Sequence, residues 1–174
     1  MKSPFNITRE ISCASVLVAL VSAGLTAIPA SALAEKPVSF KVHCMNTGNS
    51  PPEALGDRKG HSISIGEYTC KVEGGALDGG IMTGTHITEW DGVNGVGKAG
   101  FGVTRTAGGK AVYVNTEMKT TLTMKDGKVT GFLANGRGYY AVATGAAESV
   151  AGKTYSYVSK PSGPRQFIIE TTLD

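Results

Sequence analysis

The residues that can carry chemistry in this 174-residue chain are few, and one group of three is compatible with catalysis. Glu117 offers a carboxylate, and Tyr113 and Arg105 offer two polarising partners for it. A carboxylate enclosed among apolar side chains has a raised pKa and can act as a general acid or base. Enclosure also orients a reactive substrate. These three residues are therefore the catalytic candidates for an isomerase or cyclase acting on an apolar molecule.

The other chemical motifs point to no metal and no cofactor. His43, His61 and His86 are isolated, with no second histidine or cysteine at a metal-ligand spacing. Residues 89–94 contain carboxylates but lack the ligand order of a calcium-binding loop. Residues 95–100 match the G-x-G-x-x-G pattern of dinucleotide sites, which requires a helix directly afterwards. A strand-like sequence follows instead, so we expect no nucleotide site.

The first 34 residues have the pattern of a secretory signal peptide. Lys2 and Arg9 give a positive start, a charge-free run extends from Ile11 to Ile28, and Ala32-Leu33-Ala34 is a small-x-small cleavage site. An uncleaved membrane anchor is the alternative, but it would need a longer and more apolar run. We predict export to the periplasm or out of the cell, and a mature domain of residues 35–174 that is not inserted in a membrane.

Two cysteines remain in that mature domain, Cys44 and Cys70, because Cys13 lies in the predicted signal peptide. An even pair of cysteines in an exported protein favours a disulfide. A redox site would favour a Cys-x-x-Cys motif, and a metal site would need further ligands at matched spacing. The predicted bond ties the first mature strand to the second.

The catalytic candidates must be positioned by β-strands, and the clearest strand is the run from Ala111 to Lys125. Apolar and polar residues alternate along it, and Asp126-Gly127 then forms a type I′ hairpin turn. The return strand is expected to place Val129 opposite Met124 and Gly131 opposite Leu122. The apolar face provides the candidate ligand-binding residues, which are Val112, Val114, Met118, Leu122 and Met124.

The opposite face of that strand carries Tyr113 and Glu117 and is expected to face solvent. A strand of this length cannot run straight through a small domain, because usual strands have about five to ten residues. We predict a bend or bulge at Asn115-Thr116, where asparagine tolerates unusual dihedral angles. Such a bulge would turn part of the polar face, including Tyr113 and Glu117, toward the interior.

The whole mature chain is all-β by pattern, with about eight strands joined mainly by short connections. An eight-stranded antiparallel up-and-down barrel leaves no free sheet edge, and an eight-stranded sandwich is the alternative. A change of phase at Gly66-Glu67 predicts a bulge in the second strand. All but one of the 24 glycines lie in the mature domain, and we expect them to serve turns and bends.

The charge pattern excludes one large class of function. The chain has a formal net charge of +3, and its charged residues are scattered without a basic stripe. Nucleic-acid binding is therefore not expected.

Several short motifs resemble a group of small exported bacterial proteins without assigned function. They are Gly60-His61-Ser62, Cys70, Asp126-Gly127-Lys128, Thr144-Gly145 and Gly152-Lys153-Thr154-Tyr155, within a match that covers residues 60–172. Such chains look like allene-oxide-cyclase and dirigent-type barrels, which are eight-stranded antiparallel barrels of calycin-like shape. The resemblance implies a barrel with an apolar lumen, and it places no catalytic motif of the plant cyclases on this chain.

The leading functional hypothesis is a non-catalytic exported barrel that holds a small apolar molecule. It rests on the apolar strand face and on the lack of a catalytic constellation beyond the three candidates above. A purely structural barrel, filled by its own side chains, stays open as an alternative. The isomerase or cyclase is the second alternative, and it requires Tyr113 and Glu117 to point into the lumen.

Overall fold

The computed structural model describes residues 39–174. The predicted signal peptide, its cleavage site and Cys13 lie outside the described residues. The start of the predicted mature domain at Glu35 also lies outside them.

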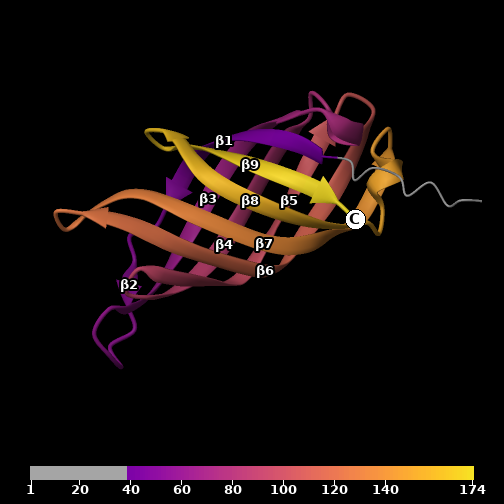
Figure 1. Ribbon diagram of the computed structural model, residues 1–174. Coiled ribbons are helices and arrows are strands. Elements are labelled where there is room, and N and C mark those ends of the chain that lie inside the picture. Colours follow the sequence, from indigo (N-terminus) through magenta and orange to yellow (C-terminus); the bar gives the residue numbers. More distant parts are fainter. Residues whose placement is uncertain (1–38) are drawn as a thin grey trace, which may run out of the picture. The chain divides into compact units, whose positions relative to one another are not determined.

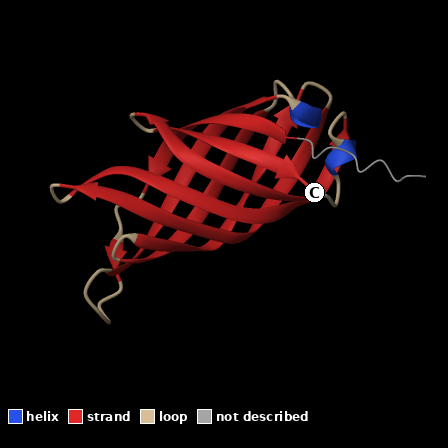
Figure 2. Ribbon diagram, in the orientation of Figure 1, coloured by secondary structure: helices blue, strands red, loops and turns tan. Residues whose placement is uncertain are grey.

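The described residues form a single antiparallel sheet that closes into a barrel (Figures 1 and 2). Eight strands make up the ring: β1 Ser39–Asn49, β3 His61–Glu73, β4 Ile81–Asp91, β5 Asn94–Thr106, β6 Gly109–Lys125, β7 Lys128–Gly145, β8 Thr154–Gly163 and β9 Gln166–Leu173. Each strand pairs with its neighbour in sequence, and β1 closes the ring by pairing with both β9 and β3. The additional strand β2, Glu53–Ala54, pairs only with β3. The prediction of an eight-stranded antiparallel barrel is confirmed, and the sandwich alternative is wrong.

The two ends of the barrel differ. At one end, short 3-10 helices follow β3 and β7, namely η1 Gly75–Leu77 and η2 Glu148–Val150 (Figure 2). Leu77 and Val150 are each only 1% exposed, so these helices plug this end with apolar side chains. The opposite end has hairpin turns and the exposed segment 50–60, which carries β2.

The disulfide predicted between Cys44 and Cys70 is present. The two cysteines are direct partners in the ladder between β1 and β3, and both are buried beside Val42 and Val72. The bond therefore links the first two long strands of the barrel from inside its core.

Replacing both cysteines by alanine should lower the free energy of unfolding by about 3 kcal/mol, since the bond closes a loop between residues separated by 26 positions. Urea unfolding of the oxidised wild type and of C44A/C70A measures the difference. A loss below about 1 kcal/mol would contradict the role given to the bond, since such bonds typically contribute about 2–4 kcal/mol.

The bulge predicted at Asn115-Thr116 is present in β6. Asn115 pairs with Gly138 and Glu117 pairs with Arg137, so Thr116 has no partner in this ladder. The extra residue changes which side chains face inward. Tyr113 and Asn115 line the lumen before it, whereas Met118, Thr120 and Leu122 line the lumen after it.

The hairpin after β6 is mostly as predicted. Asp126 and Gly127 have φ of 51° and 74°, as a type I′ turn requires, and Met124 pairs with Val129. The prediction for Leu122 is wrong, because this residue pairs with Phe132 and not with Gly131. A further register shift between Thr123 and Met124 displaces the two strands by one residue.

The phase change predicted at Gly66-Glu67 is also wrong. The ladder between β3 and β4 runs without a shift from His61 to Lys71. Ser62 and Ser64 line the lumen, whereas Ile63 between them does not. Polar side chains therefore face inward in this part of β3, so polarity does not identify the outer face there. The irregularity is instead in β1, between Asn46 and Gly48.

Candidate ligand-binding cavity

The barrel encloses a cavity of about 620 Å³. Asn49, Ser50, Pro51, Pro52 and Gly92 surround its mouth, and all five are exposed. Large apolar side chains line much of the interior: Phe40, Val42, Met82, Trp90, Met118, Leu122, Phe132, Phe167 and Ile169. Small-molecule sites usually have volumes of about 300–1,000 Å³ and predominantly apolar walls, so this lumen has the size and lining of a ligand site.

Aromatic side chains in the lumen lie across the sheet from glycines. The pairs are Tyr68 with Gly84, Trp90 with Gly95, Tyr113 with Gly102, Tyr155 with Gly138, and Tyr157 with Gly136.

A side chain at these glycines would collide with the paired aromatic ring. A Cβ on Gly84 would lie 2.8 Å from Tyr68 Cζ, and a Cβ on Gly95 would lie 2.7 Å from Trp90 Cζ3. The rings therefore cover the glycine backbone and stay close to the wall of the barrel. This packing gives many of the glycines a role that the sequence analysis did not predict, and it leaves space in the middle of the lumen.

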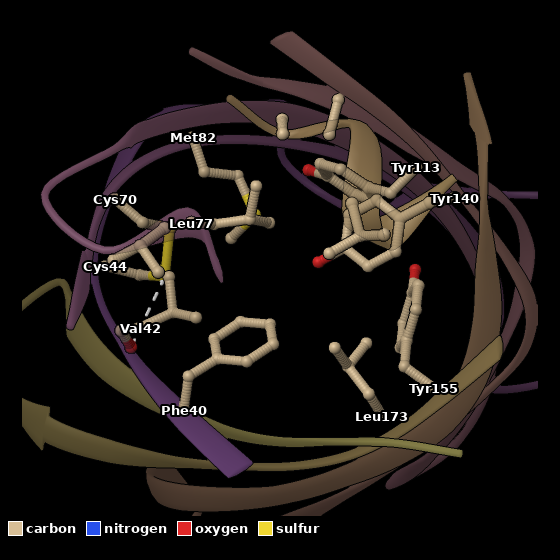
Figure 3. Close-up of a cluster of buried hydrophobic side chains, with 14 of the residues drawn as sticks. Phe40, Val42, Cys44, Cys70, Leu77, Met82, Tyr113, Tyr140, Tyr155 and Leu173 are labelled. Carbon is tan, nitrogen blue, oxygen red and sulfur yellow. Dashed lines mark hydrogen bonds between the residues drawn. A yellow bond between two sulfur atoms is a disulfide. The ribbon is translucent and has the colours of Figure 1, made fainter. Parts of the chain in front are cut away.

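The tyrosine hydroxyls form two hydrogen-bonded groups inside the barrel. Tyr68 Oη and Tyr113 Oη lie 2.9 Å apart, and Tyr155 Oη donates to Asn115 Oδ1 at 2.7 Å. Figure 3 shows Tyr113, Tyr140 and Tyr155 on one side of the interior, facing Val42 and Phe40. Burial raises the pKa of each of these tyrosines above its ordinary value, so the phenols remain protonated and neutral.

His86 is a titratable side chain of the cavity wall. Its ring lies over Gly66 and beside Tyr68, with the two ring centroids 5.9 Å apart. Burial lowers the pKa of His86, because an imidazolium would lose its hydration there. The imidazole is therefore neutral at physiological pH.

The three catalytic candidates are not brought together. Tyr113 is buried in the lumen, but Glu117 and Arg105 are exposed and do not line the cavity. Arg105 donates a hydrogen bond to Thr83 Oγ1 at 3.0 Å. The bulge at Thr116 explains why Glu117 lies outside, because it reverses the alternation between Tyr113 and Glu117. The expectation that these three residues share a site is wrong.

The candidate ligand-binding face is divided by the same bulge. Met118 and Leu122 line the cavity, as expected. Val112 and Val114 do not line it, because they precede the bulge and alternate with the inward-facing Tyr113 and Asn115. Met124 is 45% exposed beside the hairpin turn.

Several lining residues were missed by the sequence analysis, among them Tyr68, Trp90, Asn115 and Tyr155. The available signal was the number of glycines combined with isolated aromatic residues. These residues predict the cavity lining only when the strand register is known, because the register places each aromatic residue opposite a glycine.

A cluster of charged groups at the rim ties the segment before β3 to β4. His61 Nε2 lies 2.8 Å from Glu89 Oε1, and its Nδ1 contacts the carboxylate of Asp57. Arg58 contacts both Asp57 and Asp91. The hydrogen bond to Glu89, followed by the one to Asp57, raises the pKa of His61, which is only 8% exposed.

We expect the pKa of His61 to lie above the ordinary histidine value of about 6.5 and the pKa of His86 to lie below it. The stability contributed by His61 is complete below that pH and is lost as the pH rises through its folded pKa. The pH dependence that His86 contributes is the opposite. Stability is lost as the pH falls below 6.5, because the imidazole of His86 takes up its proton more readily in the unfolded chain than in the folded one. NMR titration measures both values, with H61Q and H86F assigning the signals. A reversed order would contradict the contacts described here.

Within residues 39–174, no group of three or more histidine, cysteine or acidic side chains is arranged to hold a metal ion. The helices among these residues are also too short to cross a membrane. Comparison of the chain with models of known protein families finds no match, and comparison with curated proteins also finds none.

Proposed function

We propose that this barrel binds a small, largely apolar molecule in its lumen and does not transform it. The observation that carries the proposal is the cavity of about 620 Å³, which is open to solvent at one end and lined mainly by apolar and aromatic side chains. The resemblance to calycin-like barrels, which implies an apolar lumen, supports the same proposal.

The packing of the barrel supports a binding role over a purely structural one. Small barrels usually fill their interior with side chains. Here the rings of Tyr68, Tyr113 and Tyr155 pack over glycines at the wall, and the centre stays open. An open lumen of this size adds little packing to the fold, so a role in binding accounts for it better than a structural role does.

An isomerase or cyclase reaction has less support than binding. The cavity wall formed by the described residues contains no aspartate or glutamate. Glu117, the acid-base candidate, is exposed on the outside of the barrel.

We also propose that the protein is exported and cleaved after Ala34. The buried disulfide between Cys44 and Cys70 supports this, because such bonds form and persist mainly in oxidising compartments. Mass spectrometry of the protein isolated from its natural source should find Glu35 as the first residue. A chain that still begins at Met1 would contradict export with cleavage.

Titration with N-phenylnaphthylamine, an uncharged fluorophore that brightens in apolar surroundings, tests the binding proposal. Trp90 is the only tryptophan of the chain, and it lines the cavity. We expect saturable binding of one probe per barrel, accompanied by quenching of the Trp90 emission. Weak, non-saturating fluorescence with unchanged Trp90 emission would support the purely structural alternative.

A further inference from the structure

The wall of the cavity carries no formal charge at neutral pH. None of the described lining residues is aspartate, glutamate, lysine or arginine. The acidic and basic residues of the same strands, such as Glu117, Lys119 and Arg137, are exposed. A charged group that entered the lumen would lose its hydration and find no opposite charge there, which is strongly unfavourable.

Three hydrogen-bonding side chains nevertheless lie near the middle of the lumen. His86 pairs with Gly100 in the ladder between β4 and β5. A Cβ on Gly100 would lie 2.7 Å from Asn115 Nδ2, so the side chain of Asn115 covers this glycine from β6, whereas the His86 ring covers Gly66 of β3. Tyr155 joins them from β8 through its hydrogen bond to Asn115 Oδ1.

Two members of this group have hydrogen-bonding capacity left for a ligand. The carbonyl oxygen of Asn115 accepts the Tyr155 hydroxyl, which fixes the orientation of the amide. Its Nδ2 has only the weak acceptor Met118 Sδ, at 3.3 Å. The His86 ring makes no hydrogen bond to any of residues 39–174, although both of its nitrogens can take part in one.

Apolar and aromatic side chains lie on both sides of this group. Trp90, Leu122 and Phe132 lie toward the mouth, while Phe40 and Met82 lie toward the plugged end. A ligand that fills the lumen would therefore meet His86 and Asn115 in its middle, with large apolar side chains on both sides of them.

Building on the proposed function, we propose that the ligand is an uncharged molecule, apolar over most of its length, with one hydroxyl or carbonyl oxygen. That oxygen binds at this level of the lumen, where it forms a hydrogen bond with the His86 imidazole, and Asn115 Nδ2 offers a second donor on the neighbouring part of the wall. An asparagine N–H donates to either kind of oxygen, and a neutral imidazole can donate to or accept from a hydroxyl. Carboxylates and ammonium ions are excluded by the cost of burying their charge.

Competition against bound N-phenylnaphthylamine at neutral pH tests the exclusion of charge. The competitors are decanol, decanoate and decylammonium, which share one chain length and differ in the charge of the head group. We expect decanol to displace the probe at a concentration at least about tenfold lower than either ion, because only the ions lose unreplaced hydration. Equal displacement by decanoate or decylammonium would overturn this part of the proposal.

The variant H86F tests the hydrogen-bonding group itself. It keeps a ring over Gly66 and breaks no hydrogen bond within residues 39–174. We expect its affinity for decanol to fall about fivefold relative to its affinity for the probe, the usual effect of one lost hydrogen bond. The matched control H43F makes the same replacement at an exposed histidine that does not line this cavity, and it should leave both affinities unchanged.

The outcomes separate this inference from the proposed function. If the wild type binds the probe but H86F binds decanol as tightly as the wild type, the assignment of His86 is wrong and lumen binding stands. If the wild type binds neither the probe nor decanol, both proposals are wrong.

Discussion

Replacing Ala134 by tryptophan should abolish binding of N-phenylnaphthylamine, with an affinity loss of at least about tenfold, or 1.4 kcal/mol. Ala134 lines the cavity from β7, between Thr120 of β6 and Ser159 of β8. An indole at this position would project into the lumen and occupy space that the probe requires. Probe emission, excited at a wavelength that tryptophan does not absorb, measures the affinity directly.

The matched control is L133W, at the neighbouring position of the same strand. Leu133 is 53% exposed and does not line the cavity, so its replacement adds the same indole to the outside of the barrel. L133W should bind the probe as the wild type does, and urea unfolding should show that both variants remain folded. Equal affinities of A134W and L133W would mean that the probe binds elsewhere.

Replacing Gly84 by alanine should lower the free energy of unfolding by about 2–3 kcal/mol, as is usual when a packed core receives an extra methyl group. The added Cβ would overlap the Tyr113 hydroxyl and would lie 2.8 Å from Tyr68 Cζ. Both rings are almost fully buried, which limits their room to move. The urea midpoint of unfolding measures the effect.

Two further variants separate this collision from a general effect of alanine in a strand. A Cβ on Gly131 would have its nearest neighbours at 3.8 Å, so G131A should change stability by less than about 0.5 kcal/mol. Y113F removes the hydroxyl that the new Cβ would overlap, so the cost of G84A should be smaller in the Y113F background. An equal cost in both backgrounds would show that Tyr113 is not the obstacle.

Local patterns in the sequence predict much of this barrel. The alternation from Ala111 to Lys125 and the Asp126-Gly127 turn identify the central hairpin, because strand period and turn dihedrals depend on neighbouring residues. The Cys44–Cys70 bond follows from the number of cysteines left after the predicted cleavage. The number of strands, together with the need to protect sheet edges, favours the closed barrel.

The composition of the cavity wall could not be predicted in the same way. Whether Tyr113 or Val112 faces inward depends on one unpaired residue, Thr116, whose effect is set by the register of β6 against β7. A slip of one residue moves every side chain of a strand to the other face.

The role of the glycines is likewise non-local. Gly84 must be glycine because Tyr68 of β3 and Tyr113 of β6 both reach it, and Tyr113 lies 29 positions further along the chain. Glycine content alone suggests turns and bends, whereas the register identifies the aromatic partner of each glycine.

The methionine methyl groups give the most direct test of binding in the lumen, because they report from both sides of the barrel wall. Met82 and Met118 line the cavity, whereas Met45 and Met124 are 52% and 45% exposed. In a methyl NMR titration with N-phenylnaphthylamine, the signals of Met82 and Met118 should shift and saturate together, while those of Met45 and Met124 stay in place. Shifts confined to Met45 and Met124, or no saturable shift at Met82 and Met118, would contradict a ligand-binding lumen.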